Sequence, residues 1–196
     1  MKSKILLIVF TLLTVYANSQ TPYLVRDINT STASMSSSPK EFCTIDTVTF
    51  FTATGTGYNT ELWKTDAEGT VMVKDIYPGA TGSQPKNLVA VNGVLFFTAN
   101  DGADGFELWK SDGTESGTVI VKNIAAGSAS SSPEHLVNMN GILYFTAGNA
   151  TVGTELWGSD GTAAGTVLVK DVQPGICDSY PDNLTIINNK LYFTAD

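Results

Sequence analysis

Beyond the N-terminus, the apolar positions of this chain fall in short runs separated by turn-forming residues, with no helical period. Two such runs flank the pair Asn92-Gly93, which is typical of a tight β-hairpin because both central residues must take positive φ. The same signal returns at Asn140-Gly141 and, in weaker form, at Asn188-Asn189. The strands expected around Asn92 cover 87–91, 94–99, 106–111 and 118–124. The pattern therefore predicts a unit of four short antiparallel strands.

This unit repeats with a period of 48 residues. Two full copies cover 71–118 and 119–166, a more divergent copy covers 23–70, and a partial copy covers 167–196. The expected organisation is a signal peptide at 1–19 and a repeat region at 20–196, with an N-terminal strand at 20–33 and units at 34–76, 77–124, 125–172 and 173–196. Because the last unit stops after its second strand, we expect a fragment of a longer protein with further repeats. A four-unit ring with one deficient unit is the alternative.

The second strand of each unit does not alternate between apolar and polar residues. It reads VLFFTA at 94–99, ILYFTA at 142–147 and KLYFTA at 190–195. A half-exposed antiparallel strand should alternate, so these strands require cover on both faces. Neighbouring four-stranded sheets stacked face to face supply that cover, and radial stacking gives a β-propeller. We expect an all-β, incomplete propeller of about 48 residues per blade; an open solenoid or linear array is the rival.

The third and fourth strands of each unit enclose a turn whose length sets their register. If Ser111 faces Thr118, then Trp109 faces Ile120. The turn of the first copy is two residues shorter, an even change that keeps every side chain on its own face. The same count predicts three cross-strand Glu–Lys pairs, Glu61–Lys74, Glu107–Lys122 and Glu155–Lys170.

Three further residue types recur at fixed positions of the unit. We expect the tryptophans to pack between blades, with a ligand-stacking ring as the alternative; they are Trp63, Trp109 and Trp157. The turn aspartates should accept hydrogen bonds from backbone N–H groups two residues on; they are Asp66, Asp112 and Asp160. Asp101 and Asp104 are weak candidates for calcium, because the other copies of their loop have no carboxylate.

The combination of ELW, DGT and GT at fixed spacing resembles the ELWxxDGT repeat family. Residues 107–109 with 112–114, and residues 155–157 with 160–162, fit that pattern letter for letter. The first copy departs from it, since Asp66-Ala67-Glu68 replaces the DGT. The resemblance covers nearly the whole chain after the signal peptide. It implies large secreted or surface proteins, many from Bacteroidota, and it implies no known reaction.

The N-terminus has the layout of a secretory signal peptide. Lys2 and Lys4 precede an apolar run at 5–15, and Ala17 and Ser19 place small residues before Gln20. The run is 11 residues long, shorter than the roughly 18–20 that a membrane span needs. We expect a secreted or cell-surface protein without membrane insertion after cleavage; a buried N-terminal strand is the alternative.

Charge, cysteine content and histidine content bear on which ligands and sites are expected. After cleavage nine basic and 19 acidic residues remain, a net charge of −10, which opposes binding to nucleic acid or anionic lipid.

Cys43 and Cys177 are the only cysteines; a disulfide, a buried thiol and an exposed thiol all stay open. His135 is the only histidine, and no spacing typical of a zinc site or a catalytic triad accompanies it.

These observations favour a non-catalytic module that serves binding, adhesion or scaffolding, with a protein or glycan ligand and no cofactor. The repeated glutamates are spread around the expected assembly, whereas an active site needs a few converging groups in unlike environments. Two alternatives stay open. One is part of a propeller-based extracellular hydrolase or lyase with its active-site residues outside this chain. The other is a calcium-stabilised adhesive array.

Overall fold

A computed structural model describes residues 27–28, 30, 36–57 and 59–196. The expected signal peptide at 1–19 and most of the expected strand at 20–33 lie outside these residues. Within them the protein is all-β, and no helix is long and apolar enough to cross a membrane. In this described part of the chain, fourteen strands form three four-stranded sheets and one two-stranded sheet, each antiparallel and ordered as in the sequence.

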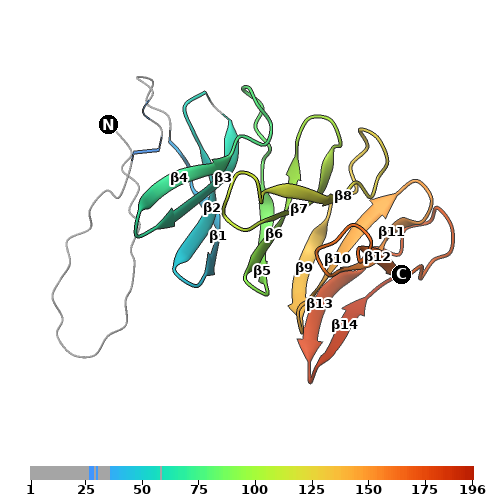
Figure 1. Ribbon diagram of the computed structural model, residues 1–196. Coiled ribbons are helices and arrows are strands. Elements are labelled where there is room, and N and C mark those ends of the chain that lie inside the picture. Colours follow the sequence, from blue (N-terminus) through green and yellow to red (C-terminus); the bar gives the residue numbers. More distant parts are fainter. Residues whose placement is uncertain (1–26, 29, 31–35, 58) are drawn as a thin grey trace.

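Each sheet is a meander of consecutive strands (Figure 1). The first sheet contains β1 (Lys40–Ile45), β2 (Val48–Thr54), β3 (Thr60–Asp66) and β4 (Gly69–Lys74). The second contains β5 (Lys86–Val91), β6 (Val94–Asn100), β7 (Phe106–Ser111) and β8 (Val119–Lys122). The third contains β9 (Glu134–Met139), β10 (Ile142–Asn149), β11 (Gly153–Ser159) and β12 (Val167–Lys170). The fourth contains β13 (Asp182–Ile187) and β14 (Lys190–Thr194).

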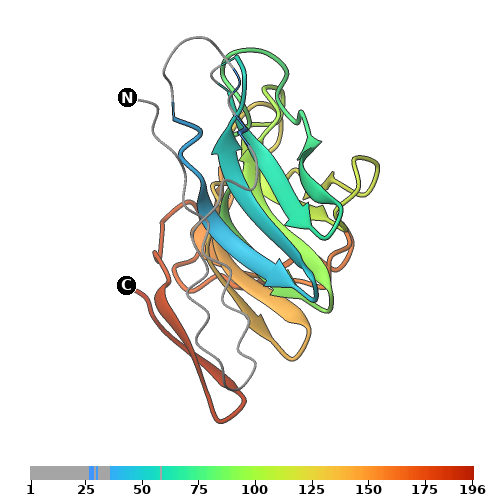
Figure 2. The ribbon, with the colours of Figure 1, turned by 90° about the vertical axis from the view of Figure 1, so that its left-hand side faces the viewer.

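The sheets follow one another in a row, with the first strand of each beside the first strand of the next. β5 lies between β1 and β9, and β13 lies against β9 on its other side. Figure 1 shows the sheets fanned out from these inner strands, and Figure 2 looks along the row with the first sheet in front. The fourth strands, β4, β8 and β12, form the far edges of their sheets.

The two faces of a central strand are covered by different neighbouring sheets. In β6, Phe96 and Phe97 are adjacent in sequence and are only 3% and 0% exposed. Phe97 belongs to a core shared with the first sheet, and Phe96 belongs to a core shared with the third. The expectation that non-alternating strands are covered on both faces by neighbouring sheets is confirmed for β6, but not for β14, whose Tyr192 and Phe193 are exposed. Each fully buried side chain of this size contributes about 1.5–3 kcal/mol.

The turn signals and most of the strand register are as predicted. Asn92-Gly93, Asn140-Gly141 and Asn188-Asn189 all have positive φ at both residues. Trp109 pairs with Ile120, and its counterparts in the other copies pair with Met72 and Leu168. The shorter turn of the first copy therefore leaves the tryptophan pairing intact, because a two-residue deletion preserves the faces of both strands.

The same count also predicted three Glu–Lys cross-strand pairs, Glu61–Lys74, Glu107–Lys122 and Glu155–Lys170, and this is wrong. Lys122 pairs with Leu108 while Ile120 pairs with Trp109, so Val121 is an extra residue in β8. This β-bulge shifts the register by one residue beyond Trp109. The same shift occurs in the first and third sheets.

A second bulge recurs near the start of each inner strand and was not predicted. The register shifts there in all four sheets. The second residue of each inner strand is in the left-handed region, with φ between 53° and 59°. These residues are Glu41, Asn87, His135 and Asn183. The bulge bends the start of the strand, and the residue that it holds differs among the repeats.

Candidate functional site

The glutamate of each ELW sequence is a buried hydrogen-bond centre. Glu107 is fully buried and accepts hydrogen bonds from Ile124 N at 2.9 Å, Ala125 N at 3.2 Å and Ser131 N at 3.0 Å. Ser131 Oγ donates a fourth at 2.5 Å. Burial raises the pKa of Glu107 above its usual value, and the four donors partly oppose this. We call this glutamate with its serine the carboxylate latch.

The latch occurs in all three complete repeats. Its members are Glu61 with Ser83, Glu107 with Ser131, and Glu155 with Ser179. Burial raises the pKa of Glu61 as well, again against donors that lower it. The serine lies in the connection to the next sheet, and its carbonyl accepts a backbone N–H from the second strand there or, for Ser179, from Asp196 just after that strand. For Ser131 the donor is Gly148 N, at 2.9 Å. The latch therefore joins consecutive sheets.

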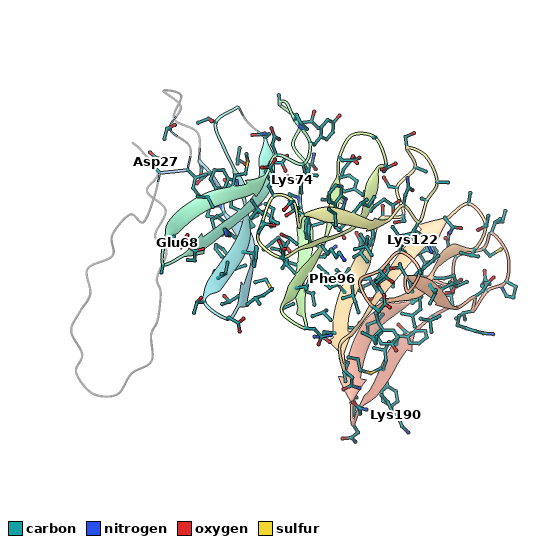
Figure 3. All side chains as sticks on the ribbon, in the orientation of Figure 1. Asp27, Glu68, Lys74, Phe96, Lys122 and Lys190 are labelled. Carbon is teal, nitrogen blue, oxygen red and sulfur yellow. The ribbon has the colours of Figure 1, made fainter. Side chains whose placement is uncertain are left out.

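The repeated lysines also bridge sheets instead of pairing with glutamate. Lys74 Nζ donates to Thr118 O at 2.9 Å, and Lys122 Nζ donates to Thr166 O at 2.8 Å. Figure 3 shows these two lysines at successive places along the row. Lys170, at the corresponding position of the third sheet, is exposed.

Trp109 and Trp157 lie in the interfaces between sheets, as predicted, whereas the core that contains Trp63 includes no residue of another sheet. Trp109 packs with residues of the first sheet, and Trp157 packs with residues of the second. Trp63 shares a small core with Phe51 and Ala53, and Ile28 packs against that core. All three rings are at most 8% exposed, so they are not available to stack on a ligand. Trp157 Nε1 donates to Ala147 O at 3.0 Å.

The turn aspartates make the predicted local hydrogen bonds. Asp112 Oδ1 accepts from Thr114 N at 2.8 Å and from Thr114 Oγ1 at 2.7 Å, which lowers the pKa of Asp112. Asp160 and Thr162 repeat this arrangement, and the pKa of Asp160 is lowered for the same reason. Asp66 Oδ1 accepts from Glu68 N in the shorter turn. These carboxylates stabilise turns.

The weak metal candidates are engaged within their own loop. Asp101 Oδ1 accepts from Ala103 N and Asp104 N, and Asp104 Oδ1 accepts from Asn123 Nδ2 at 2.6 Å. Across the described ranges, no group of three or more His, Cys, Asp or Glu side chains is placed to hold a metal ion.

The two cysteines are separate free thiols. Cys43 lies in β1 and is half-buried, and burial raises the pKa of its thiol. Cys177 lies in the connection after β12 and is exposed. Of the three possibilities that the sequence left open, the disulfide is therefore not formed.

A band of polar side chains crosses the starts of the inner strands, and sequence reasoning missed it. We call it the inner polar row. It consists of Lys40, Glu41, Lys86, Asn87, Glu134, His135, Asp182 and Asn183. Its members link consecutive sheets: Glu41 Oε2 accepts from Asn87 N at 3.0 Å, and Lys86 Nζ lies 3.1 Å from Glu134 Oε1.

Two features make this row a candidate binding surface. Its side chains are exposed or half-buried, whereas the latch glutamates are fully buried. Its residues also differ from repeat to repeat, at positions whose backbone conformation is the same. A signal was present in the sequence. A Ser-x-Pro sequence precedes each inner strand, and the two residues directly after its proline change in charge between copies while their surroundings repeat.

His135 lies in this row but does not form a catalytic triad. Its Nε2 is 3.4 Å from Asp182 Oδ1, and its Nδ1 is 3.4 Å from Thr146 Oγ1. The Thr146 hydroxyl also reaches the Glu134 carbonyl oxygen at 3.2 Å. The equivalent threonine at position 52 makes the same kind of bond to a β1 carbonyl, with no histidine beside it. The threonine therefore supports the bulge in each case and is not an activated nucleophile.

The comparisons with known proteins give no relative. No family model matches the chain, and neither a curated protein nor a solved structure matches it.

Proposed function

We propose that this chain is a non-catalytic secreted or cell-surface module of the ELWxxDGT type, whose sheets are the blades of a β-propeller. The blades act as a rigid scaffold, and the inner polar row contacts an extracellular protein or glycan. The observation that carries the proposal is the carboxylate latch. In the latch, the repeated buried carboxylates are bonded to backbone N–H groups and a serine, so they have a structural role. The variable inner polar row is then the remaining candidate surface for recognition.

The propeller assignment is supported by the arrangement of the strands. The inner strands lie side by side, the meander runs outward in every sheet, and consecutive sheets are joined by equivalent cores. A four-stranded meander repeated radially in this way is the unit of a propeller.

The chemistry of the inner polar row favours a polar, uncharged or mixed-charge ligand. The row has lysines in the first two sheets and carboxylates in the last two, with a carboxylate, a histidine or an amide beside each, so it presents no continuous positive surface for a polyanion. Side chains of both signs with amide groups suit glycan hydroxyls or a polar protein surface.

Binding is tested with the double substitution Glu41→Asn and His135→Asn. Asn87 and Asn183 already occupy the equivalent positions with the same positive φ, and Asn tolerates that conformation well. The variant should keep its melting temperature and lose binding to whichever extracellular protein or glycan the wild type recognises on an array. Glu115→Gln, an exposed change in an outer turn, is the control and should bind as the wild type does. Unchanged binding by the double variant would exclude the inner polar row.

Export is tested separately. When the full chain is expressed in its native host, mass spectrometry of the extracellular fraction should find a mature protein that begins at Gln20. An intact N-terminus in the cytoplasmic fraction would contradict the proposed localisation.

A further inference from the structure

A second row of variable residues lies directly before the inner polar row. Each inner strand follows a Ser-x-Pro sequence, and the residue x is exposed in all four copies. We call these residues the pre-proline row; they are Ser38, Gln84, Ser132 and Tyr180. Only the proline separates each of them from the inner polar row, so the two rows run side by side across the sheet junctions.

The pre-proline row has the same left-handed backbone as the bulges. Its φ angles lie between 39° and 48°, although the residue before a proline favours an extended backbone. The junction between sheets holds this conformation, because Gln84 N donates to Thr60 O of the preceding sheet and Ser132 N donates to Phe106 O, each at 3.0 Å. The backbone of the row is therefore fixed, while its side chains differ between copies.

The residue types at these left-handed positions are unusual. Glycine takes positive φ without strain, and Asn or Asp tolerates it. Outside the two rows, every described residue with positive φ is Gly, Asn or Asp, whereas six residues within them are of other types. The six are Ser38, Glu41, Gln84, Ser132, His135 and Tyr180. A side chain kept on a strained and exposed backbone, where glycine would be free of strain, indicates a role for that side chain.

The composition of the two rows favours one class of ligand. Protein interfaces are rich in aromatic residues, Met and Arg, and poor in Lys, Glu, Asp and Ser. Of the twelve residues in the two rows, seven belong to the second group, namely two each of Ser, Lys and Glu and one Asp. Tyr180 is the only Tyr, Trp or Phe among the twelve, and none is Met, Arg or aliphatic. The apolar anchors that a protein partner needs are therefore missing.

The charged side chains of the rows suit hydroxyl groups. Lys86 Nζ and Glu134 Oε1 are 3.1 Å apart, and these two side chains remain 40% and 50% exposed. Glu41 Oε2 accepts from Asn87 N at 3.0 Å. These bonds fix the side chains before a ligand arrives, which lowers the entropy lost on binding. The lysine keeps free donors and the carboxylates keep free acceptors, and a sugar hydroxyl can both donate and accept.

The charge of the rows favours a neutral ligand. Two lysines and three carboxylates give a net charge of −1 with His135 neutral, so the rows do not attract a polyanion. We propose that the two rows together bind a neutral glycan, and that the pre-proline row determines which one. This inference rests on the binding role proposed for the inner polar row and names the class of its ligand.

Binding is measured with the full chain on an array of neutral glycans, and by native electrophoresis in gels that contain dextran, mannan, xyloglucan or galactan. We expect at least one neutral polysaccharide to retard the protein, and neither heparin nor polygalacturonate to do so. Gln84→Gly with Ser132→Gly should weaken this binding at least about tenfold, because two hydrogen-bonding side chains are lost. Relief of strain and the greater backbone freedom of unfolded glycine oppose each other, so the melting temperature should shift by less than about 4 °C.

Two further variants sharpen the test. Asp46→Gly is the matched control, because Asp46 is exposed and has a φ of 51° in the hairpin at the other end of β1; this variant should bind as the wild type does. The exchange Gln84→Ser with Ser132→Gln keeps the composition of the pre-proline row and alters only its order. It should change the order of affinities among the neutral polysaccharides.

The outcomes separate this inference from the function on which it rests. If Glu41→Asn with His135→Asn abolishes glycan binding while the glycine variant and the exchange leave it unchanged, the inner polar row binds and the role of the pre-proline row is wrong. Binding only to a protein or an anionic polysaccharide, with no neutral glycan bound, would overturn the glycan assignment and leave the proposed binding function in place. If no variant of either row changes binding, both are wrong.

Discussion

Removing one hydroxyl from the second carboxylate latch is the most direct perturbation of the sheet junctions. Ser131→Ala deletes the 2.5 Å hydrogen bond to Glu107 Oε2 and leaves the Ser131 backbone N–H in place. Glu107 keeps its bonds from Ile124 N and Ala125 N. A hydrogen bond to a charged group contributes about 1.5–3 kcal/mol, and we expect the free energy of unfolding to fall by that amount. For a chain of this size, each kcal/mol lowers the melting temperature by roughly 2–4 °C.

Urea unfolding followed by tryptophan fluorescence measures this change, since all three tryptophans are buried and two of them lie between sheets. The control is Ser128→Ala, an exposed position in the same connection, which should change the free energy of unfolding by less than about 0.5 kcal/mol. The slope of the free energy against urea should stay the same in both variants, because neither changes the surface exposed on unfolding.

Double-mutant cycles separate the latch from the cross-strand pairing that the sequence predicted. Glu107→Gln and Ser131→Ala should couple by about 0.5–3 kcal/mol, because the two side chains share a hydrogen bond. Glu107→Gln and Lys122→Gln should be additive, because Lys122 bonds to Thr166 O instead. Strong coupling to Lys122 together with none to Ser131 would refute the latch.

Four further predictions concern the stacking and the turns. Trp109→Ala should cost about 3–5 kcal/mol and increase amide exchange in the first sheet, whose core it shares; exchange confined to the second sheet would contradict this. The isolated segment 77–124 should be unfolded by circular dichroism, since a stacked repeat needs its neighbours. Gly161→Ala should destabilise by about 1–3 kcal/mol, because φ is +88° and the new Cβ would lie 2.9 Å from Phe96 Cζ; a melting curve measures it. Asp112→Asn should flatten the loss of stability on acidification, because the lowered pKa of Asp112 gives a contribution present above about pH 4 and lost as pH falls through the folded-state pKa.

The strands and turns could be predicted because their determinants are local. The pair Asn92-Gly93 specifies a hairpin through its own backbone preferences. Phe96 and Phe97, which are adjacent in sequence, indicate that both faces of their strand are buried. Register across the third turn was also predictable as far as Trp109, because it depends only on counting from that turn. These are properties of segments shorter than about a dozen residues.

The carboxylate latch could not be predicted in the same way, because counting residues from a turn gives the wrong strand register beyond a β-bulge. Val121 has the composition of an ordinary strand residue, and nothing local marks it as unpaired. The partner of Glu107 lies 24 residues away, in a connection without regular structure. One signal was available: the same spacing separates Glu155 from Ser179, and it is 22 residues in the shorter first copy. The repeated distance in sequence between the glutamate and the serine indicated the latch, whereas the pairing rules for neighbouring strands do not consider residues so far apart.

Within one repeat, the carboxylate latch stabilises the junction between sheets, and the inner polar row supplies exposed residues that vary. The buried glutamate and serine tie each sheet to the next, so a substitution there affects a junction and with it the cooperativity of the row. The left-handed residue of the bulge, His135 in the third sheet, has a fixed backbone but an exposed side chain. Because the conformation is set by the bulge and not by side-chain burial, this position can change between copies at little cost in stability. A scaffold that separates its stabilising residues from its exposed variable ones in this way can alter the surface that we propose for binding without altering its fold.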